Sequence, residues 1–194
     1  MKILNIIDED IVNYKKTSMY IAFPNCSMKC NIDCGKVICQ NVSLLESSYI
    51  NVDVDTLINR YLNNPLTHAI VFGGLEPFDS HFDIIPFMHA LRNKYKCNDE
   101  VVIYTGYTEE ELEGTSLYDY QNACKQDILT SIYKELKSYD NVIVKFGRYV
   151  ENNDKHFDEV LGVYLASDNQ YAKLFKNLLY IIYNFMYKEI IYLA

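Results

Sequence analysis

Four cysteines within fourteen residues constrain this chain more than any other feature. Cys26, Cys30, Cys34 and Cys39 follow one another with the spacing C-x3-C-x3-C-x4-C. Thiolates this close repel one another unless a metal or a disulfide joins them, and a loop backbone can curl around one metal centre. We favour a metal, because the sequence shows no signal peptide that would indicate an oxidising compartment. A disulfide loop and four unconnected thiols are the alternatives.

The composition indicates a globular protein without a nucleic-acid surface. The chain has 194 residues, of which 49% are hydrophobic, and a net charge of −8. This length fits one domain with a sizeable core, and the negative charge without any basic run disfavours a nucleic-acid partner. The N-terminus turns acidic by residue 8, which is too short and too charged for a signal peptide. We therefore expect a reducing, cytoplasmic location and no membrane attachment.

Apolar runs alternate with amphipathic segments along the chain, which is typical of an α/β fold with a mostly parallel sheet. We expect buried strands at 18–23, 68–72, 101–104 and 142–144, an edge strand at 161–165, and helices at 53–63, 80–94, 109–113 and 125–139.

One domain is predicted over residues 1–194, with its core at about 17–170 and an apolar tail at 171–194. Within this tail, Leu178 to Tyr187 is too short to span a bilayer. We interpret it as a helix docked on the sheet, with a partner contact or membrane-surface attachment as alternatives.

Glycine turns follow the second and third predicted strands. The first is Gly73-Gly74-Leu75-Glu76-Pro77 and the second is Tyr104-Thr105-Gly106-Tyr107. Glycine lets the backbone approach a ligand closely. A glycine pair alone is weak evidence, but its place some 35 residues after the cysteine cluster raises its value.

Taken in order along residues 17–170, these segments resemble the radical S-adenosylmethionine proteins, in particular the small activating proteins of anaerobic ribonucleotide reductases. The resemblance is carried by five segments: Cys39-Gln40-Asn41, Gly74-Leu75-Glu76-Pro77-Phe78, Tyr104-Thr105-Gly106-Tyr107-Thr108, Val142-Ile143-Val144 with Gly147-Arg148, and Ser167-Asp168-Asn169-Gln170.

The resemblance implies an incomplete parallel β/α barrel with a [4Fe-4S] cluster at the carboxyl ends of its strands. Three cysteines would hold the cluster, and its fourth iron would bind the amino and carboxylate groups of S-adenosylmethionine. An electron from the cluster would then break a sulfur–carbon bond and give a 5′-deoxyadenosyl radical. The radical would activate a large glycyl-radical reductase, with flavodoxin or ferredoxin as the electron donor. The cofactor-binding positions so implied are Gly73, Gly74, Glu76, Gly106 and Tyr107.

The sequence departs from this family at two places. The usual spacing is C-x3-C-x2-C, so the third ligand is either Cys34, one residue late, or Cys39, after an enlarged loop at 31–38. We favour Cys39, because Cys39-Gln40-Asn41 reproduces the family's context after its last cysteine. Leu75 stands where the family usually has a second glycine, and a shift of one residue to Gly73-Gly74 is the alternative reading.

Two rival functions remain open at this point. One is a radical S-adenosylmethionine enzyme that acts on another small molecule or a peptide. The other is a binding protein in which all four cysteines hold zinc or an iron–sulfur cluster, without an open iron. Cys97 and Cys124 are isolated and are interpreted as incidental thiols.

Overall fold

The fold is seen in a computed structural model, which describes residues 1–114 and 123–176. Within these residues, six strands form the main sheet in the order β10-β7-β6-β5-β3-β2. The strands are β1 (Lys2–Ile3), β2 (Asn5–Asp10), β3 (Ser18–Phe23), β4 (Ile50–Asn51), β5 (Ala69–Gly74), β6 (Glu100–Tyr104), β7 (Val142–Phe146), β8 (His156–Asp158), β9 (Val163–Leu165) and β10 (Tyr171–Phe175).

The four central strands, β3, β5, β6 and β7, are parallel, whereas β2 and β10 run antiparallel at the two edges. The prediction of an α/β fold with a mostly parallel sheet is confirmed. The incomplete barrel stays a prediction, because β2 and β10 do not pair and the sheet described is open.

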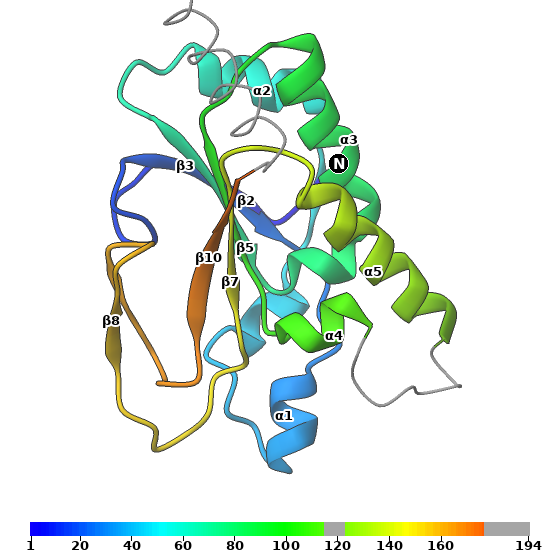
Figure 1. Cartoon of the computed structure of the whole chain (residues 1–194), viewed down its shortest axis with the longest axis vertical. Helices are drawn as coiled ribbons and strands as arrows, with labels where there is room; N and C mark the ends of the chain where they lie inside the picture. Colours follow the sequence, from blue (N-terminus) through cyan, green and yellow to red (C-terminus); the bar gives the residue numbers. More distant parts are fainter. Residues whose placement is uncertain (115–122, 177–194) are drawn as a thin grey trace, which may run out of the picture.

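Helices cover one face of the sheet, and a small ribbon of β8 and β9 covers the other (Figure 1). Helix α1, which carries two of the clustered cysteines, projects from the end of the sheet at the bottom of that view. The helical segments are α1 (Lys29–Cys34), η1 (Val42–Glu46), α2 (Val54–Leu62), η2 (Pro77–Ser80), α3 (His81–His89), η3 (Ala90–Lys94), α4 (Glu109–Glu113) and α5 (Ala123–Leu136).

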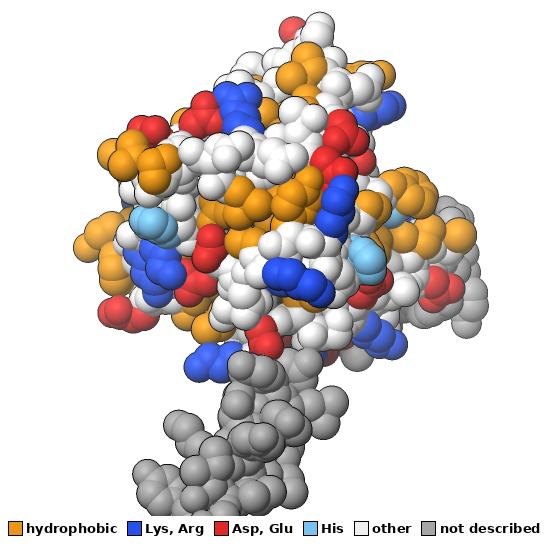
Figure 2. All heavy atoms as spheres, turned by 90° about the horizontal axis from the view of Figure 1, so that it is seen from above, with side chains coloured by type: hydrophobic (Ala, Val, Ile, Leu, Met, Phe, Trp, Pro, Cys, Tyr) orange, Lys and Arg blue, Asp and Glu red, His pale blue; other side chains and the backbone are white. Residues whose placement is uncertain are grey.

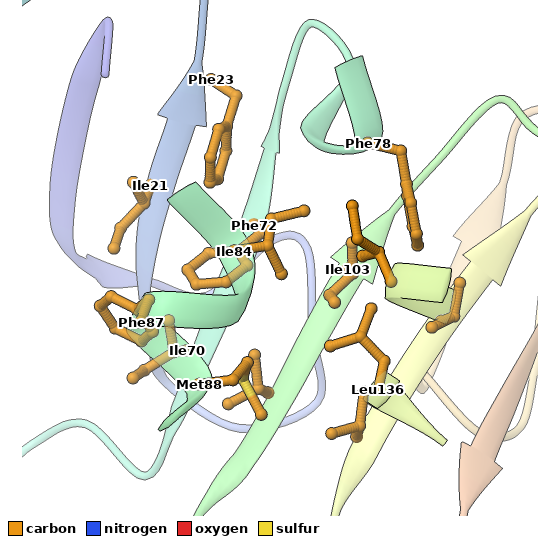
Figure 3. Close-up of a cluster of buried hydrophobic side chains, with 14 of the residues drawn as sticks. Ile21, Phe23, Ile70, Phe72, Phe78, Ile84, Phe87, Met88, Ile103 and Leu136 are labelled. Carbon is orange, nitrogen blue, oxygen red and sulfur yellow. The ribbon is translucent and has the colours of Figure 1, made fainter. Parts of the chain in front are cut away.

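The main core lies between the sheet and the helices. Phe72 of β5 packs edge-on against Phe23 and Phe87, with ring centroids 5.2 and 5.1 Å apart, and Figure 3 shows these rings between the strands and α3. Burial of apolar side chains such as these is the dominant favourable contribution to folding. The buried residues of α3 are Ile84, Phe87 and Met88, whereas Phe82 is 79% exposed.

Three expectations about strands were wrong. Gly73 and Gly74 are not a turn, because β5 continues through them and pairs with Ala22 and Phe23 of β3. The segment at 161–165 is not an edge strand of the main sheet, since β9 pairs only with β8. The edge strand is β10, Tyr171–Phe175, which pairs with β7 and lies in the stretch assigned to the tail. Leu178 to Tyr187 lies outside the described residues.

Side chains cap the N-termini of two helices. The Asp53 side chain accepts a hydrogen bond from the N–H of Thr56 at the start of α2. Thr108 and Glu111 form a capping box at the start of α4.

The face in Figure 2 mixes acidic and basic side chains around a central apolar patch. No described helix is long and apolar enough to cross a membrane.

Candidate metal centre

The cysteine loop begins where β3 ends. Cys26 lies in the loop, and Cys30 and Cys34 lie on the short helix α1. Met28, which precedes α1, has a φ of 54°, in the left-handed region. Its N–H donates to Cys26 Sγ at 3.2 Å. Hydrogen bonds of this kind stabilise a thiolate, and they are one of the features that tune iron–sulfur clusters.

Asn31 closes the enlarged loop that brings Cys39 back toward α1. Its Oδ1 accepts from the N–H groups of Ile38 and Cys39, at 2.9 and 3.0 Å. Two residues further on, Asn41 Nδ2 donates to the carbonyl of Gly74 at 3.0 Å. The loop is therefore tied both to its own helix and to the end of β5.

Three of the four clustered cysteines line one cavity of about 240 Å³ at the carboxyl edge of the sheet. These are Cys26, Cys30 and Cys39. Cys34 is exposed and lines a neighbouring cavity of about 590 Å³. The two cavities share the side chains of Cys30, Arg148 and Tyr149. Cys39 thus shares a cavity with both Cys26 and Cys30, whereas Cys34 shares one with Cys30 alone.

Most of the other sequence-predicted site residues line the same cavity, namely Gly73, Gly74, Glu76 and Gly106. Leu75 also lines it. Tyr107 does not, because its ring is buried beneath the cysteine loop, where it lines a cavity of only about 20 Å³. Its hydroxyl donates to Asp79 Oδ1 at 2.7 Å, and Asp79 Oδ2 accepts from the N–H of Ser27 at 2.6 Å. Tyr107 therefore supports the loop through Asp79.

Glu76 joins the turns that follow β5 and β6. Its Oε1 accepts from the N–H of Phe78 at 3.1 Å and from Thr105 Oγ1 at 2.8 Å, and its Oε2 accepts from the N–H of Gly106 at 2.8 Å. Burial raises the pKa of Glu76 to about 7, against the hydrogen bonds from Gly106 and Thr105, which lower it. The carboxyl group is thus fixed in place at the wall of the cavity.

Gly74 is required by a close approach of the backbone, whereas a Cβ on Gly106 would make only ordinary contacts. A Cβ on Gly74, whose φ is +87°, would lie 2.7 Å from the backbone nitrogen of Phe23. A Cβ on Gly106 would point into the site, 3.5 Å from Glu76 Oε2 and 3.9 Å from Cys30 Sγ. Any side chain at Gly106 would occupy the space beside the thiol.

The thiols lie among negative groups. Burial raises the pKa of Cys26 to about 11, and the carboxylates of Glu76 and Asp79 add to this effect. Burial also raises the pKa of Cys30, and the nearby Cys39 thiolate adds to it. A positively charged iron centre would relieve these repulsions between negative groups.

The residues present fit an iron–sulfur cluster. Three thiols converge on one cavity, and two of them, Cys26 and Cys30, accept backbone N–H bonds, from Met28 and Tyr149. Among the described residues, no three His, Cys, Asp or Glu side chains lie close enough to share a single metal ion. A cubane needs a wider spacing than this, because each thiolate binds a different iron atom.

Several residues of the site were missed by sequence reasoning. Lys145 lines the cavity from β7, and Asn31 and Asp79 hold the cysteine loop. For Lys145 a signal was present, since it is the only polar residue in Val142–Phe146. Nothing in the sequence pattern indicated the contacts made by Asn31 and Asp79.

Comparison with known families agrees with this geometry. A family model described as a 4Fe-4S single cluster domain matches residues 16–158. The chain belongs to this 4Fe-4S single cluster domain family. The match covers the cysteine loop and the turns that follow β5, β6 and β7. No curated protein matches the chain. Family membership thus identifies the iron–sulfur cofactor.

Asn31→Ala is expected to weaken retention of the cluster. The change removes the acceptor of two backbone N–H groups next to Cys39, each worth about 1 kcal/mol. We expect iron to be lost to a chelator roughly tenfold faster than from the wild type, as followed by absorbance. Asn59→Ala, which removes only a surface contact to Tyr95, is the control. Equal rates for the two variants would contradict the role given to Asn31.

Proposed function

We propose that this 4Fe-4S domain cleaves S-adenosylmethionine reductively and uses the 5′-deoxyadenosyl radical to activate a glycyl-radical enzyme. The substrate we favour is an anaerobic ribonucleotide reductase. The observation that carries the proposal is that three of the clustered thiols, and not four, line the cavity to which Gly73 and Gly74 at the end of β5 also contribute. Three protein thiolates leave one iron of a cubane free for a second ligand, which a four-cysteine site would not.

Cys26, Cys30 and Cys39 would hold the cluster, which when bound supplies the electron that breaks the sulfur–carbon bond. Glu76 is suited to accept hydrogen bonds from an amino group of the cofactor. Its Oε2 receives a single hydrogen bond among the described residues, and it lines the cavity. An ionised carboxylate oxygen can accept more than one such bond.

Backbone at the end of β5 would approach the cofactor because Gly73 and Gly74 carry no side chains. Leu75 adds an apolar wall.

Arg148 stands between the two cavities, where its guanidinium binds Glu111 Oε1 at 2.7 Å and Asp33 Oδ2 at 3.4 Å. It links α1 to α4 and so fixes the position of Cys30 against the sheet. We propose that the larger cavity beyond it, of about 590 Å³, receives a segment of the partner protein.

The decisive experiment uses anaerobically reconstituted protein with S-adenosylmethionine and a strong reductant. Release of 5′-deoxyadenosine well above that of the Cys26→Ala control is expected, and its absence from protein with a full cluster would refute the proposed chemistry. Adding the large subunit of an anaerobic ribonucleotide reductase tests the substrate. A glycyl radical detected by electron paramagnetic resonance supports it, whereas cleavage without that radical would favour another substrate.

A further inference from the structure

A buried lysine lies in the same cavity as the three thiols. Lys145 is on β7, directly opposite Tyr104 of β6 in the parallel pairing. Its neighbours Val144 and Phe146 face the helix-covered core, so Lys145 points to the other face of the sheet. There it lines the cavity with Cys26, Cys30 and Cys39, and only 6% of its surface is exposed.

The charge of Lys145 is not balanced by a carboxylate in direct contact. Its Nζ donates to the carbonyl of Gly147 at 2.8 Å, which is a neutral acceptor. In the part of the chain that the structure describes, Lys145 makes no ion pair. Burial lowers its pKa to about 8, while the negative charges of Glu76 and Cys30 oppose that change. The negative charges of Glu76 and Cys30 favour the ammonium form.

Arg148, the other cation at this cavity, differs in this respect. Its guanidinium pairs with Glu111 and Asp33, which offset its charge. An ammonium group without such a partner is costly to bury, so it is expected where an anionic group lies nearby. The anionic groups of this cavity are the thiolates and Glu76.

We propose that the buried ammonium group of Lys145 raises the reduction potential of the iron–sulfur cluster. Reduction adds one electron to a centre that already carries three thiolates, so the reduced form gains more from a nearby cation than the oxidised form does. Loss of this charge therefore disfavours reduction. The inference rests on the proposed cluster position, but not on cleavage of S-adenosylmethionine.

The test is a redox titration of the reconstituted holoprotein, followed by electron paramagnetic resonance. Lys145→Gln removes the charge but keeps an N–H donor for Gly147, and Lys145→Arg keeps both. Lys145→Gln is expected to lower the equilibrium constant for reduction at least tenfold, which is about 59 mV for one electron. Lys145→Arg is expected to stay close to the wild type. Lys137→Gln, at an exposed pair with Glu113, is the control and should not change the potential.

Lys145→Met serves as a second neutral variant and should match Lys145→Gln. Equal potentials in the wild type and both neutral variants would overturn the inference, as would a shift in Lys145→Arg as large as that in Lys145→Gln. Iron and sulfide content separates the two proposals. A wild-type protein without a cluster would end both, whereas a full cluster with an unchanged potential would end this one alone.

Discussion

Cys39→Ala is expected to abolish binding of the cluster, whereas Cys34→Ala leaves it in place. Cys39 lines the cavity with Cys26 and Cys30, and Cys34 is exposed and lines the neighbouring one. A cubane held by two thiolates lacks a protein ligand for two of its irons. Loss of Cys39 should therefore weaken cluster binding far more than loss of Cys34, which is not a ligand. Reconstituted Cys39→Ala should therefore hold almost no iron, against about four atoms per chain in Cys34→Ala.

The measurement is anaerobic counting of iron and acid-labile sulfide, with absorbance in the thiolate-to-iron region. Cys26→Ala and Cys30→Ala are the positive controls for loss, and Cys97→Ala is the matched control at an isolated thiol. Iron retained by Cys39→Ala and lost from Cys34→Ala would reverse the assignment of the third ligand. Loss of metal from the alanine variants of all four clustered cysteines would indicate a four-cysteine site. Such a site would have no iron free to bind a second ligand.

Features that depend on neighbours along the chain were predictable from the sequence. The N-caps at Asp53 and Thr108 are local, since each side chain bonds a backbone N–H three residues away. The first parallel strand was equally clear, because Ser18–Phe23 is a short apolar run that ends at a proline. The parallel direction of the central strands followed from the alternation of strands and helices.

Features set by distant partners were not predictable. Gly73 and Gly74 look like a turn, yet β3 extends beside them and draws both into the sheet. The choice between Cys34 and Cys39 could not be made from spacing alone, because the position of Cys39 depends on the side chain of Asn31. In α3, the apolar residues form more than one possible stripe, and only packing against β5 selects Phe87 over Phe82.

Charge inside the cavity was the least visible feature in the sequence. A lysine in a strand is usually placed at a solvent-exposed position, and the run Val142–Phe146 gives no sign of what lies opposite it. Only the pairing of β7 with β6 puts Lys145 beside Tyr104 and close enough to Cys30 for an electrostatic interaction. Glu76 is similar, since the turn after β5 does not reveal that it bonds to the turn after β6.

Glu76→Ala is expected to cause the largest loss of stability among single changes near the cavity. The carboxyl group is 5% exposed and accepts bonds from two backbone N–H groups, of Phe78 and Gly106, and from the Thr105 hydroxyl. Alanine would leave the buried N–H of Phe78 and the partly buried N–H of Gly106 without an acceptor, at a cost of about 3 kcal/mol after allowing for relief of the buried carboxylate. For a chain of this length, the midpoint of thermal unfolding should fall by roughly 10 °C.

Glu76→Gln is expected to fall between the wild type and Glu76→Ala. Its amide oxygen can still accept from Phe78 and Thr105, but its NH₂ group would then face the N–H of Gly106, where neither group can accept. Glu113→Ala is the matched control, because it breaks only an exposed pair with Lys137 and should cost less than about 1 kcal/mol. The measurement is the midpoint of thermal unfolding of the wild type and the three variants, reconstituted and matched for iron content. If Glu76→Ala unfolds at the same temperature as Glu113→Ala, Glu76 does not hold the two turns together, and its position at the cavity wall would need another cause.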